Sequence, residues 1–339
     1  MWGEKTMLYK LLPTRVYRAY YGGENIDLIC DGETKGKSRY PEDWLASVTE
    51  AFNPDRPMKG EGLSLTEDGN YLKTIIDENK EAMIGKSEKM ELLFKMLDSA
   101  ERLVIQGHPT REFAREHFHS NYGKTECWYM LNDGGSVYLG FKPGITKEHW
   151  KKLFEVQDIQ GMLECLHEFK VQKKDMIFVA GGVPHAIGKG CFVAELQEPT
   201  DLMVIPERVT PSGITLAEQK LHGGLGFEKM FDCFVYEGLE REEVMRRYFL
   251  KPKELEKNRT LLVGSETTDI FQLEEMTVKE HSTFKTENYG ILLVTDGNGI
   301  VNGRAVKPGA RFFVPYQDKE LVCEGDFTFL LCSAGKKDK

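Results

Sequence analysis

Short apolar stretches, each ended by glycine, proline or aspartate, recur along most of this chain and constrain its fold more than any other feature. Residues 289–315, YGILLVTDGNGIVNGRAVKPGARFFVP, show the pattern most clearly. They predict strand, turn, strand, turn and strand, with DGNG as a hairpin turn or loop. Strands of this kind are typical of β-sandwiches and β-barrels. We therefore expect a mainly β protein.

Two segments interrupt the strand pattern. Residues 66–83 and 146–170 carry apolar side chains at three- and four-residue spacing, which predicts helical insertions. With 339 residues, the chain is long enough for two domains. We expect residues 1–248 to form the larger domain, with the helical insertions, and residues 249–339 to form a smaller β domain.

Composition limits the partners that we expect. The net charge of −9 gives no electrostatic reason to expect nucleic acid or an anionic membrane as a partner. The first residues, MWGEKTMLYKLLP, lack the apolar core of a signal peptide, and no apolar run is long enough to cross a bilayer. The seven cysteines include no CxxC pair and lie in apolar segments. We expect a cytoplasmic protein with reduced thiols.

One predicted strand, GKTECWYML at 123–131, carries charges of opposite sign. Residues two apart on a strand share a face, so Lys124 and Glu126 point to the same side. Such a pair on an inward face implies a metal, a substrate or a buried ion pair. The alternative is a solvated pair on an edge strand.

Two further segments carry chemistry. In RLVIQGHPT at 102–110, a predicted strand, Gln106 and His108 also share a face. In DMIFVAGGVPHAIGKG at 175–190, a strand ends in two glycines and His185 follows a turn. Together with Glu126, these residues form a nitrogen and oxygen set suited to zinc or another first-row divalent ion, provided that the segments converge.

Each of these histidines could instead be structural. His117 and His119 form a rival HxH pair, but TREFAREHF at 110–118 predicts a short helix that would put them on different faces.

Four ordered segments give the chain a family resemblance. ELLFKMLDSAERLVIQGHPT, GKTECWYML, GGVPHAIGKG and ELQEPTD resemble, in order and spacing, segments of the type I mannose-6-phosphate isomerases, also called phosphomannose isomerases. The resemblance implies two cupin barrels, of the jelly-roll type, with the metal in the first. It also implies one Zn²⁺ held by Gln106, His108, Glu126 and His185, and it leaves out His117 and His119.

The implied activity is the interconversion of mannose 6-phosphate and fructose 6-phosphate through a cis-enediol. Negative charge develops on a sugar oxygen, so a cation aimed there would stabilise the intermediate. On the resemblance, the catalytic residues are Lys124, which either transfers a proton or only hydrogen-bonds the sugar, and Arg208. The phosphate needs cationic or hydroxyl donors. The candidates for these donors are Arg15, Arg18, Ser47 and Lys189.

Three segments depart from the family pattern: RVYRAYYGGENI at 15–26, EDWLASVTEAF at 42–52, and DLMVIPERV at 201–209, which contains Arg208 and is shorter than in better-known members. An isomerase of a different aldose therefore stays open. So does a metal-bearing cupin that senses a sugar or a sugar phosphate without turning it over. No histidine follows His281, so we expect no second metal site in the C-terminal domain. We expect a monomer or a homodimer.

Overall fold

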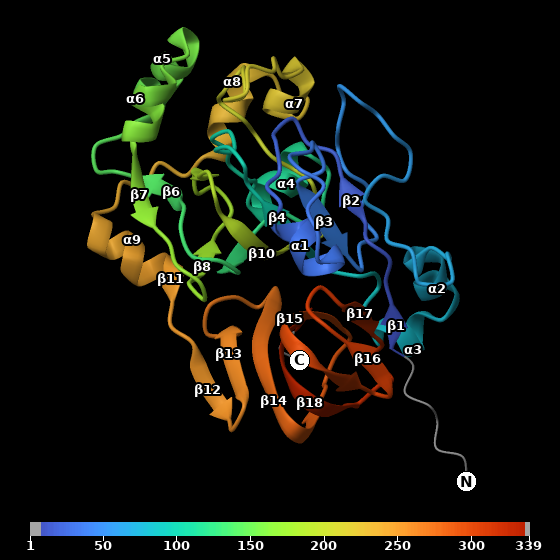
Figure 1. Cartoon of the computed structure of the whole chain (residues 1–339). Coiled ribbons are helices and arrows are strands. Elements are labelled where there is room, and N and C mark those ends of the chain that lie inside the picture. The colour runs from blue at the N-terminus through green and yellow to red at the C-terminus, as the bar shows by residue number, and fades with distance from the viewer. Residues whose placement is uncertain (1–7, 336–339) are drawn as a thin grey trace.

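The computed structural model describes residues 8–335, and these form three antiparallel sheets with short helices between the strands (Figure 1). The seven-stranded and three-stranded sheets make the upper part of the molecule in Figure 1, and the eight-stranded sheet makes the lower part. The mainly β fold with helical insertions in the first part of the chain is confirmed.

The upper part contains a seven-stranded and a three-stranded sheet. The seven-stranded sheet has, in spatial order, β11 (Phe249–Leu250), β8 (Met176–Val179), β5 (Glu126–Met130), β10 (Phe192–Gln197), β4 (Leu93–Asp98), β3 (Glu42–Leu45) and β2 (Arg15–Val16). The three-stranded sheet has β7 (Leu166–Lys170), β6 (Ser136–Phe141) and β9 (His185–Ile187). Strand β5 lies well inside its sheet, between β8 and β10.

The lower part is one eight-stranded sheet. Its strands are β1 (Tyr9–Lys10), β17 (Arg311–Val314), β15 (Gly290–Val301), β18 (Glu320–Ala334), β14 (Phe271–Lys285), β13 (Arg259–Val263) and β12 (Lys253–Glu256), and β16 (Arg304–Val306) pairs with β15. Strand β1 joins this sheet from the other end of the sequence, by pairing with β17. The division into two domains at residues 248 and 249 stays a prediction.

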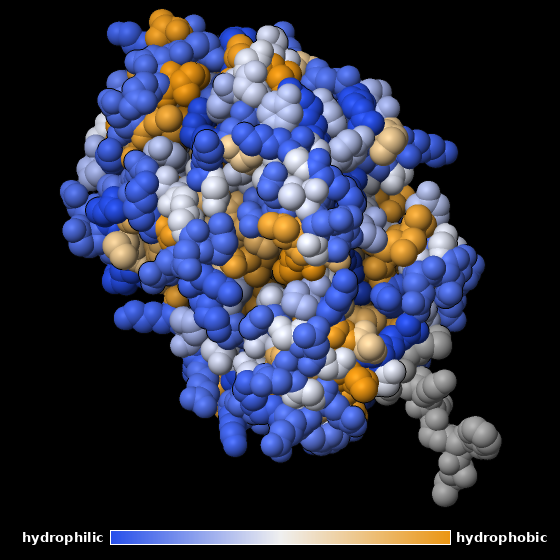
Figure 2. All heavy atoms as spheres, in the orientation of Figure 1, coloured by the Kyte–Doolittle hydropathy of each residue, from blue (hydrophilic) through white to orange (hydrophobic). Residues whose placement is uncertain are grey.

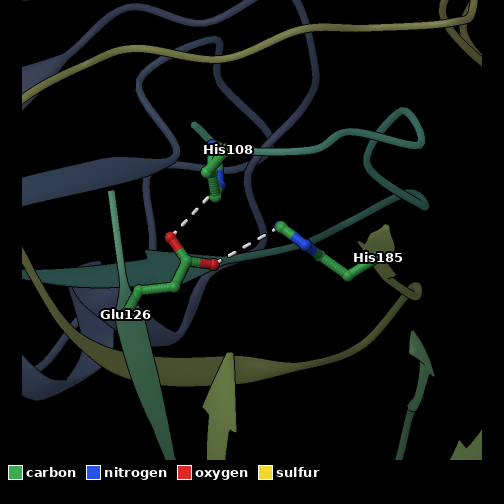
Figure 3. A group of neighbouring side chains, drawn as sticks. All are labelled: His108, Glu126 and His185. Atoms are coloured by element: carbon green, nitrogen blue, oxygen red, sulfur yellow. Dashed lines mark ion pairs between the residues drawn. The ribbon is translucent and has the colours of Figure 1, made fainter. Parts of the chain in front are cut away.

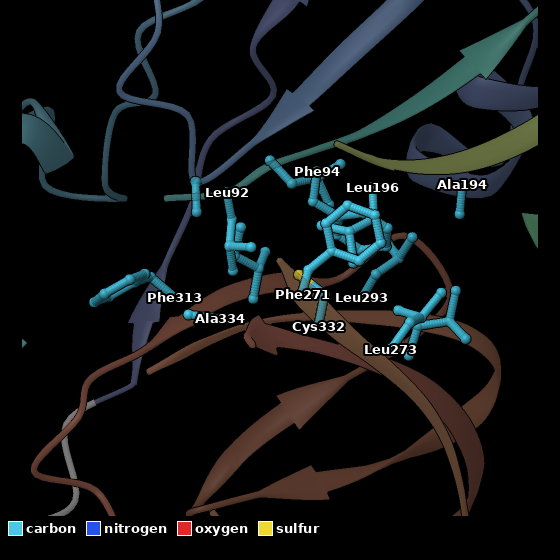
Figure 4. Packing of buried hydrophobic residues seen from close by; sticks show 14 of the residues in the cluster. Leu92, Phe94, Ala194, Leu196, Phe271, Leu273, Leu293, Phe313, Cys332 and Ala334 are labelled. Atoms are coloured by element: carbon cyan, nitrogen blue, oxygen red, sulfur yellow. The ribbon is translucent and has the colours of Figure 1, made fainter. Parts of the chain in front are cut away.

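Alternation along the strands explains how the sheets stack. On β5, Cys127 and Tyr129 face the lower sheet, while Trp128 and Met130 pack with the three-stranded sheet. Both faces of the seven-stranded sheet are therefore covered. Figure 4 shows the lower contact, in which Phe94 and Leu196 meet apolar side chains of the C-terminal sheet. Figure 2 shows apolar side chains gathered near the middle of this face of the molecule.

Short helices fill the connections. They are α1 (Asn25–Asp31), α2 (Leu72–Glu78), α3 (Lys80–Ile84), α4 (Arg111–His117), α5 (Lys147–Val156), α6 (Ile159–Glu164), α7 (Glu218–His222), α8 (Phe227–Met230), a 3₁₀ turn η1 (Phe231–Cys233) and α9 (Arg241–Tyr248). Thr110, Thr146 and Asp158 each cap a helix by accepting a hydrogen bond from a backbone N–H three residues on. Within the described residues, no helix is long and apolar enough to cross a membrane.

The structure corrects three local predictions. Residues 66–71 precede the helices of the first insertion, and residues 166–170, predicted as helix, form strand β7. DGNG is not a turn, because β15 runs through it with a bulge between Val294 and Asp296. The hairpin turn comes later, at Asn302 and Gly303, both with positive φ. The seven cysteines are free thiols, and all except the half-buried Cys30 are buried, as expected.

Candidate metal centre and the adjoining pocket

Glu126 opens strand β5, and Lys124 lies two residues before it. Both side chains are buried, and β5 has a neighbour on each side. A solvated pair on an edge strand is therefore excluded. The strand instead brings a carboxylate and an ammonium to a buried face that also carries Trp128, whose indole N–H donates to Glu126 Oε1 at 3.0 Å.

His185 and Gln106 come together through backbone pairing. The N–H of each residue donates to the carbonyl of the other at 2.9 Å, which forms an isolated antiparallel bridge. Side chains paired in this way lie on the same face. Apart from this bridge and one at Gly107, residues 102–110 form no strand, which corrects that prediction. Gly107 fits here because a Cβ atom would lie 2.4 Å from the ring of Phe234.

His108, Glu126 and His185 form one compact cluster (Figure 3). One candidate ligand atom from each residue lies within 4.8 Å of the other two. His108 Nε2 is 3.2 Å from Glu126 Oε2, and His185 Nε2 is 3.4 Å from Glu126 Oε1. The two carboxylate oxygens thus face one imidazole each. The convergence on which the sequence prediction depended is present for these three residues.

In both rings, Nδ1 is engaged by a backbone carbonyl and Nε2 faces the cluster. Nδ1 of His108 is 3.0 Å from the Leu202 carbonyl, and Nδ1 of His185 is 2.9 Å from the Val183 carbonyl. A carbonyl only accepts, so each Nδ1 carries the hydrogen and each Nε2 offers a lone pair. His185 Nε2 and Glu126 Oε2 are buried without a hydrogen-bond partner in the described structure. Converging buried lone pairs of this kind fit a divalent metal ion.

The charge states also suit a metal. Burial lowers the pKa of His108 to about 3, with Lys124 adding to the effect, and burial also lowers the pKa of His185. Both imidazoles are therefore neutral at pH 7, as metal ligands must be. Burial opposes the ionisation of Glu126, but Lys124 and His108 outweigh it and hold its pKa well below the usual value. The cluster presents one negative charge and two neutral nitrogens.

Lys124 borders this cluster on one side. Its Nζ lies 3.1 Å from His108 Nε2, 3.4 Å from Glu126 Oε2 and 4.0 Å from Glu195 Oε1. Lys124 and Gln106 also line a pocket with about 990 Å³ of empty space, including its open mouth.

Comparison with known proteins gives a consistent result. No protein-family model matches the chain. The probable mannose-6-phosphate isomerase GmuF of Bacillus subtilis is 25% identical over 250 residues, which cover 71% of this chain and 74% of GmuF. A mannose-6-phosphate isomerase of Streptococcus mutans is 32% identical over 147 residues, 41% of this chain and 45% of that protein, so the match spans less than half of its length.

Among solved structures, the mannose 6-phosphate isomerase of Bacillus subtilis superposes with a TM-score of 0.75 and 21% identity, covering 96% of this chain and 99% of that one. A putative mannosephosphate isomerase of Archaeoglobus fulgidus superposes with a TM-score of 0.74 and 20% identity, covering 99% and 100%. This chain has the phosphomannose isomerase fold. The resemblance read from its sequence motifs is thereby confirmed.

Three strands of this phosphomannose isomerase fold, β3, β4 and β10, contribute charged residues to the pocket, and we call them its floor. The sequence analysis did not single out these charges. Glu195 on β10 lies directly opposite Lys95 on β4, with 3.2 Å between Oε1 and Nζ. Lys95 Nζ is also 3.5 Å from Glu42 Oε2 on β3. Burial raises the pKa of Glu195 to about 8, although Lys95 lowers it. No opposite charge lies two residues from either within its strand, so the spacing argument that found Lys124 does not identify them.

The chain of charges continues at the other end of the floor. Arg18 donates from Nε to Glu42 Oε1 at 3.0 Å, and its two terminal nitrogens each donate to one oxygen of Asp201 at 3.0 Å. Arg18 was a candidate phosphate donor, and the structure places it in the pocket with its nitrogens already engaged. Lys124, Glu195, Lys95, Glu42, Arg18 and Asp201 thus alternate in sign along one buried row.

Several predicted site residues lie outside both the metal cluster and the pocket of this phosphomannose isomerase fold. They are Arg15, Ser47, His117, His119, Lys189 and Arg208. The guanidinium of Arg208 lies 4.6 Å from the ring centroids of both Phe154 and Phe227. A catalytic role for Arg208 stays a prediction without a supporting contact. The substrate-binding roles of Ser47, Arg15 and Lys189 also stay predictions. Ser47 is buried and hydrogen-bonds Thr49, and Arg15 forms an ion pair with Asp27. Lys189 is exposed. The rival pair also lies outside the cluster, with His117 at the end of helix α4 and His119 beyond it.

Proposed function

We propose that this chain is a zinc-dependent aldose–ketose isomerase that interconverts mannose 6-phosphate and fructose 6-phosphate. One observation carries the proposal. Lys124 lies between a buried His–Glu–His cluster suited to a metal and an adjoining pocket lined by charged and apolar side chains. The named relatives support the substrate, since proteins called mannose-6-phosphate isomerase match in sequence and in fold.

His108, Glu126 and His185 would hold the metal through Nε2, a carboxylate oxygen and Nε2. Gln106 is the fourth ligand in this proposal, because it pairs with His185 and lines the same pocket. A set of neutral imidazoles, one carboxylate and an amide suits zinc. When bound, zinc supplies positive charge that polarises the sugar carbonyl and stabilises negative charge on its oxygen.

The protein's own groups would move the protons. Isomerisation through a cis-enediol transfers one proton between C1 and C2 and another between the two oxygens. In our proposal, Lys124 donates a hydrogen bond to the oxygen that gains charge, and its position at the pocket suits transfer between the oxygens. Glu195, 4.0 Å from Lys124, is a second proton carrier, because a pKa of about 8 lets it hold or release a proton near neutral pH.

A different aldose remains the second candidate substrate, because many of the residues that line the pocket are apolar. The apolar lining residues are Leu97, Leu103, Val104, Met203, Ile205, Ile214 and Leu216. Such a wall offers no hydrogen bonds to sugar hydroxyls, so it recognises shape more than hydroxyl pattern. Residues 17–20 and 42, which lie in two of the segments that depart from the family pattern, line the same pocket.

The test is an assay of fructose 6-phosphate formation from mannose 6-phosphate by the purified protein. It is run as purified, after chelation, and after zinc is restored. Turnover that disappears on chelation and returns with zinc supports the proposal. A protein that holds one zinc per chain and turns over neither mannose 6-phosphate nor other phosphorylated or free aldoses is not an isomerase, and a sensor is then the better description.

A further inference from the structure

Four cationic side chains line the pocket, and they differ in their partners. Arg18, Lys95 and Lys124 each have a carboxylate oxygen within 4.0 Å. Among the residues that the structure describes, Lys220 has none, and its Nζ donates instead to the carbonyl oxygen of Phe52. Three of the pocket cations are thus paired inside the protein, and Lys220 is not.

Lys220 reaches the pocket from helix α7, near the end of the charged row formed by Arg18 and Asp201. Its side chain is buried, with 8% of the residue exposed. The same helix is fixed against the neighbouring loop, where the Ala217 N–H donates to Asp55 Oδ2 at 3.5 Å. Leu216 and Ile205 line the pocket on this side, so the surroundings of the ammonium are partly apolar.

A buried ammonium whose only hydrogen-bond acceptor in the described structure is a neutral carbonyl is costly, because the water it has lost is only partly replaced. Asp201 is the carboxylate that acts on it most strongly, but Asp201 already pairs with Arg18. An anionic ligand in the pocket would remove that cost. Poor solvation around the ammonium also strengthens its attraction for such a ligand. The charges of the other three cations are already compensated by internal carboxylates, and Arg18 pairs with two of them.

We propose that Lys220 binds the phosphate group of the sugar phosphate and is the main cationic determinant of specificity for phosphorylated substrates. This inference rests on the proposed function for the identity of the substrate. Thr210 and Thr215 line the same pocket and carry hydroxyl groups that suit phosphate oxygens. The sequence candidates for phosphate binding, Lys189 among them, are not required.

The electrostatics of Lys220 agree with this role. Burial lowers the pKa of Lys220 to about 8, although Asp201 acts to raise it. A phosphate dianion beside the ammonium would stabilise its charged form and move the pKa back up.

The first measurement is steady-state kinetics of Lys220→Met with mannose 6-phosphate. Loss of one charged hydrogen bond predicts a KM about 10- to 100-fold higher. We expect kcat to change far less, and Lys220→Arg to restore part of the affinity. The matched control is Lys152→Met, which removes an exposed lysine on helix α5 and leaves KM unchanged.

The second measurement does not depend on turnover. Inorganic phosphate is titrated calorimetrically into the zinc-loaded wild type and into Lys220→Met, with thermal unfolding as a check on folding. We expect phosphate affinity to fall at least 10-fold in Lys220→Met, without a lower Tm.

The outcomes separate the two proposals. If the wild type isomerises mannose 6-phosphate but both KM and phosphate affinity are unchanged in Lys220→Met, the inference is overturned and the isomerase stands. If the wild type shows no isomerisation, yet phosphate binds and the variant loses it, the substrate assignment fails while Lys220 is supported as a phosphate site. If Lys220→Met does not fold, Lys220→Gln and Lys220→Arg decide the matter by the same measurements.

Discussion

Lys124 Nζ and His108 Nε2 lie 3.1 Å apart, so the lysine contacts the very nitrogen that would hold a metal. Nδ1 of His108 is committed to the Leu202 carbonyl, which leaves Nε2 as the acceptor. The ammonium and a metal ion therefore compete for one lone pair. Metal binding would release Lys124 from His108 and leave its donors free for the sugar oxygens at the adjoining pocket.

Glu126→Gln should abolish metal binding. Glu126 is the single carboxylate of the cluster and faces both imidazoles, and a neutral amide cannot replace its charge. We expect the zinc content, measured by mass spectrometry after dialysis, to fall from about one per chain to near zero, and isomerase activity to fall with it. Glu195→Gln is the matched control, because it neutralises a buried carboxyl outside the cluster and should keep the metal. Full zinc occupancy in Glu126→Gln would contradict this assignment.

Lys124→Met should keep the metal and lose turnover. Removal of a positioned proton donor predicts a kcat lower by roughly 10² to 10⁴. The zinc content should stay at about one per chain, since the competing ammonium is gone. The measurement is kcat and zinc content on the same preparation, with Lys152→Met as the control for loss of a lysine. Near-normal kcat in zinc-loaded Lys124→Met would show that this lysine takes no part in the chemistry.

The affinity for mannose 6-phosphate should weaken as the pH rises through about 8, the value to which burial lowers the pKa of Lys220. Asp201 and Glu42 act to raise that pKa, whereas Arg18 and Lys124 act to lower it. Lys220 is charged below pH 8 and neutral above it, so phosphate binds best on the acid side. We expect kcat/KM, which reports the free enzyme, to fall above pH 8.

Lys220→Arg supplies the comparison for this profile. An arginine stays protonated throughout, so the fall near pH 8 should be absent or moved to higher pH. The profile is recorded from pH 6 to about 9.5 for both proteins, with zinc content checked at each end. An identical alkaline fall in both would assign it to another group.

Asp43→Asn should destabilise the whole protein. Asp43 on β3 forms a buried ion pair with Arg311 on β17 and accepts the Thr14 N–H at 2.8 Å. Removing one charge of a buried pair leaves the other uncompensated, which costs about 3 to 5 kcal/mol. Equilibrium unfolding in urea measures the loss. The double variant Asp43→Asn with Arg311→Met should recover part of it, and a single variant as stable as the wild type would argue against coupling between the two parts.

Local sequence patterns placed Glu126 on a buried strand face and His185 after a turn, because these are properties of single segments. They left open whether these residues meet His108, and the complete ligand set came only from the family resemblance. Lys95 and Glu195 were missed because their meeting depends on the register between β4 and β10, which no local pattern encodes. The position of Arg208 could not be predicted for a similar reason. It follows a loop, and its direction is decided by aromatic rings from α5 and α8 that lie far away in the sequence.

The prediction of a turn at DGNG was wrong for a local reason that the sequence does not reveal. Gly297 has a φ of 74°, as a turn residue would, but it lies within strand β15, just after the bulge between Val294 and Asp296. A Cβ at this position would lie 2.2 Å from the Asp326 carbonyl oxygen on the neighbouring strand. That close approach requires glycine. Glycine is typical both of turns and of strand positions that lie close to a neighbouring backbone, so the sequence does not distinguish the two. The helix predicted for 146–170 was too long because β7 begins directly after Cys165, the C-terminal cap of α6.

Strand β1 pairs with strand β17, which is synthesised much later. Tyr9 pairs with Phe313, about 300 residues further along the chain. At a typical 5 to 20 residues per second, roughly 15 to 60 s separate the synthesis of the two partners on the ribosome. The apolar underside of the seven-stranded sheet stays uncovered for much of that time. Nascent chains should therefore need chaperone protection until the last strands emerge, and premature termination should yield aggregation-prone fragments.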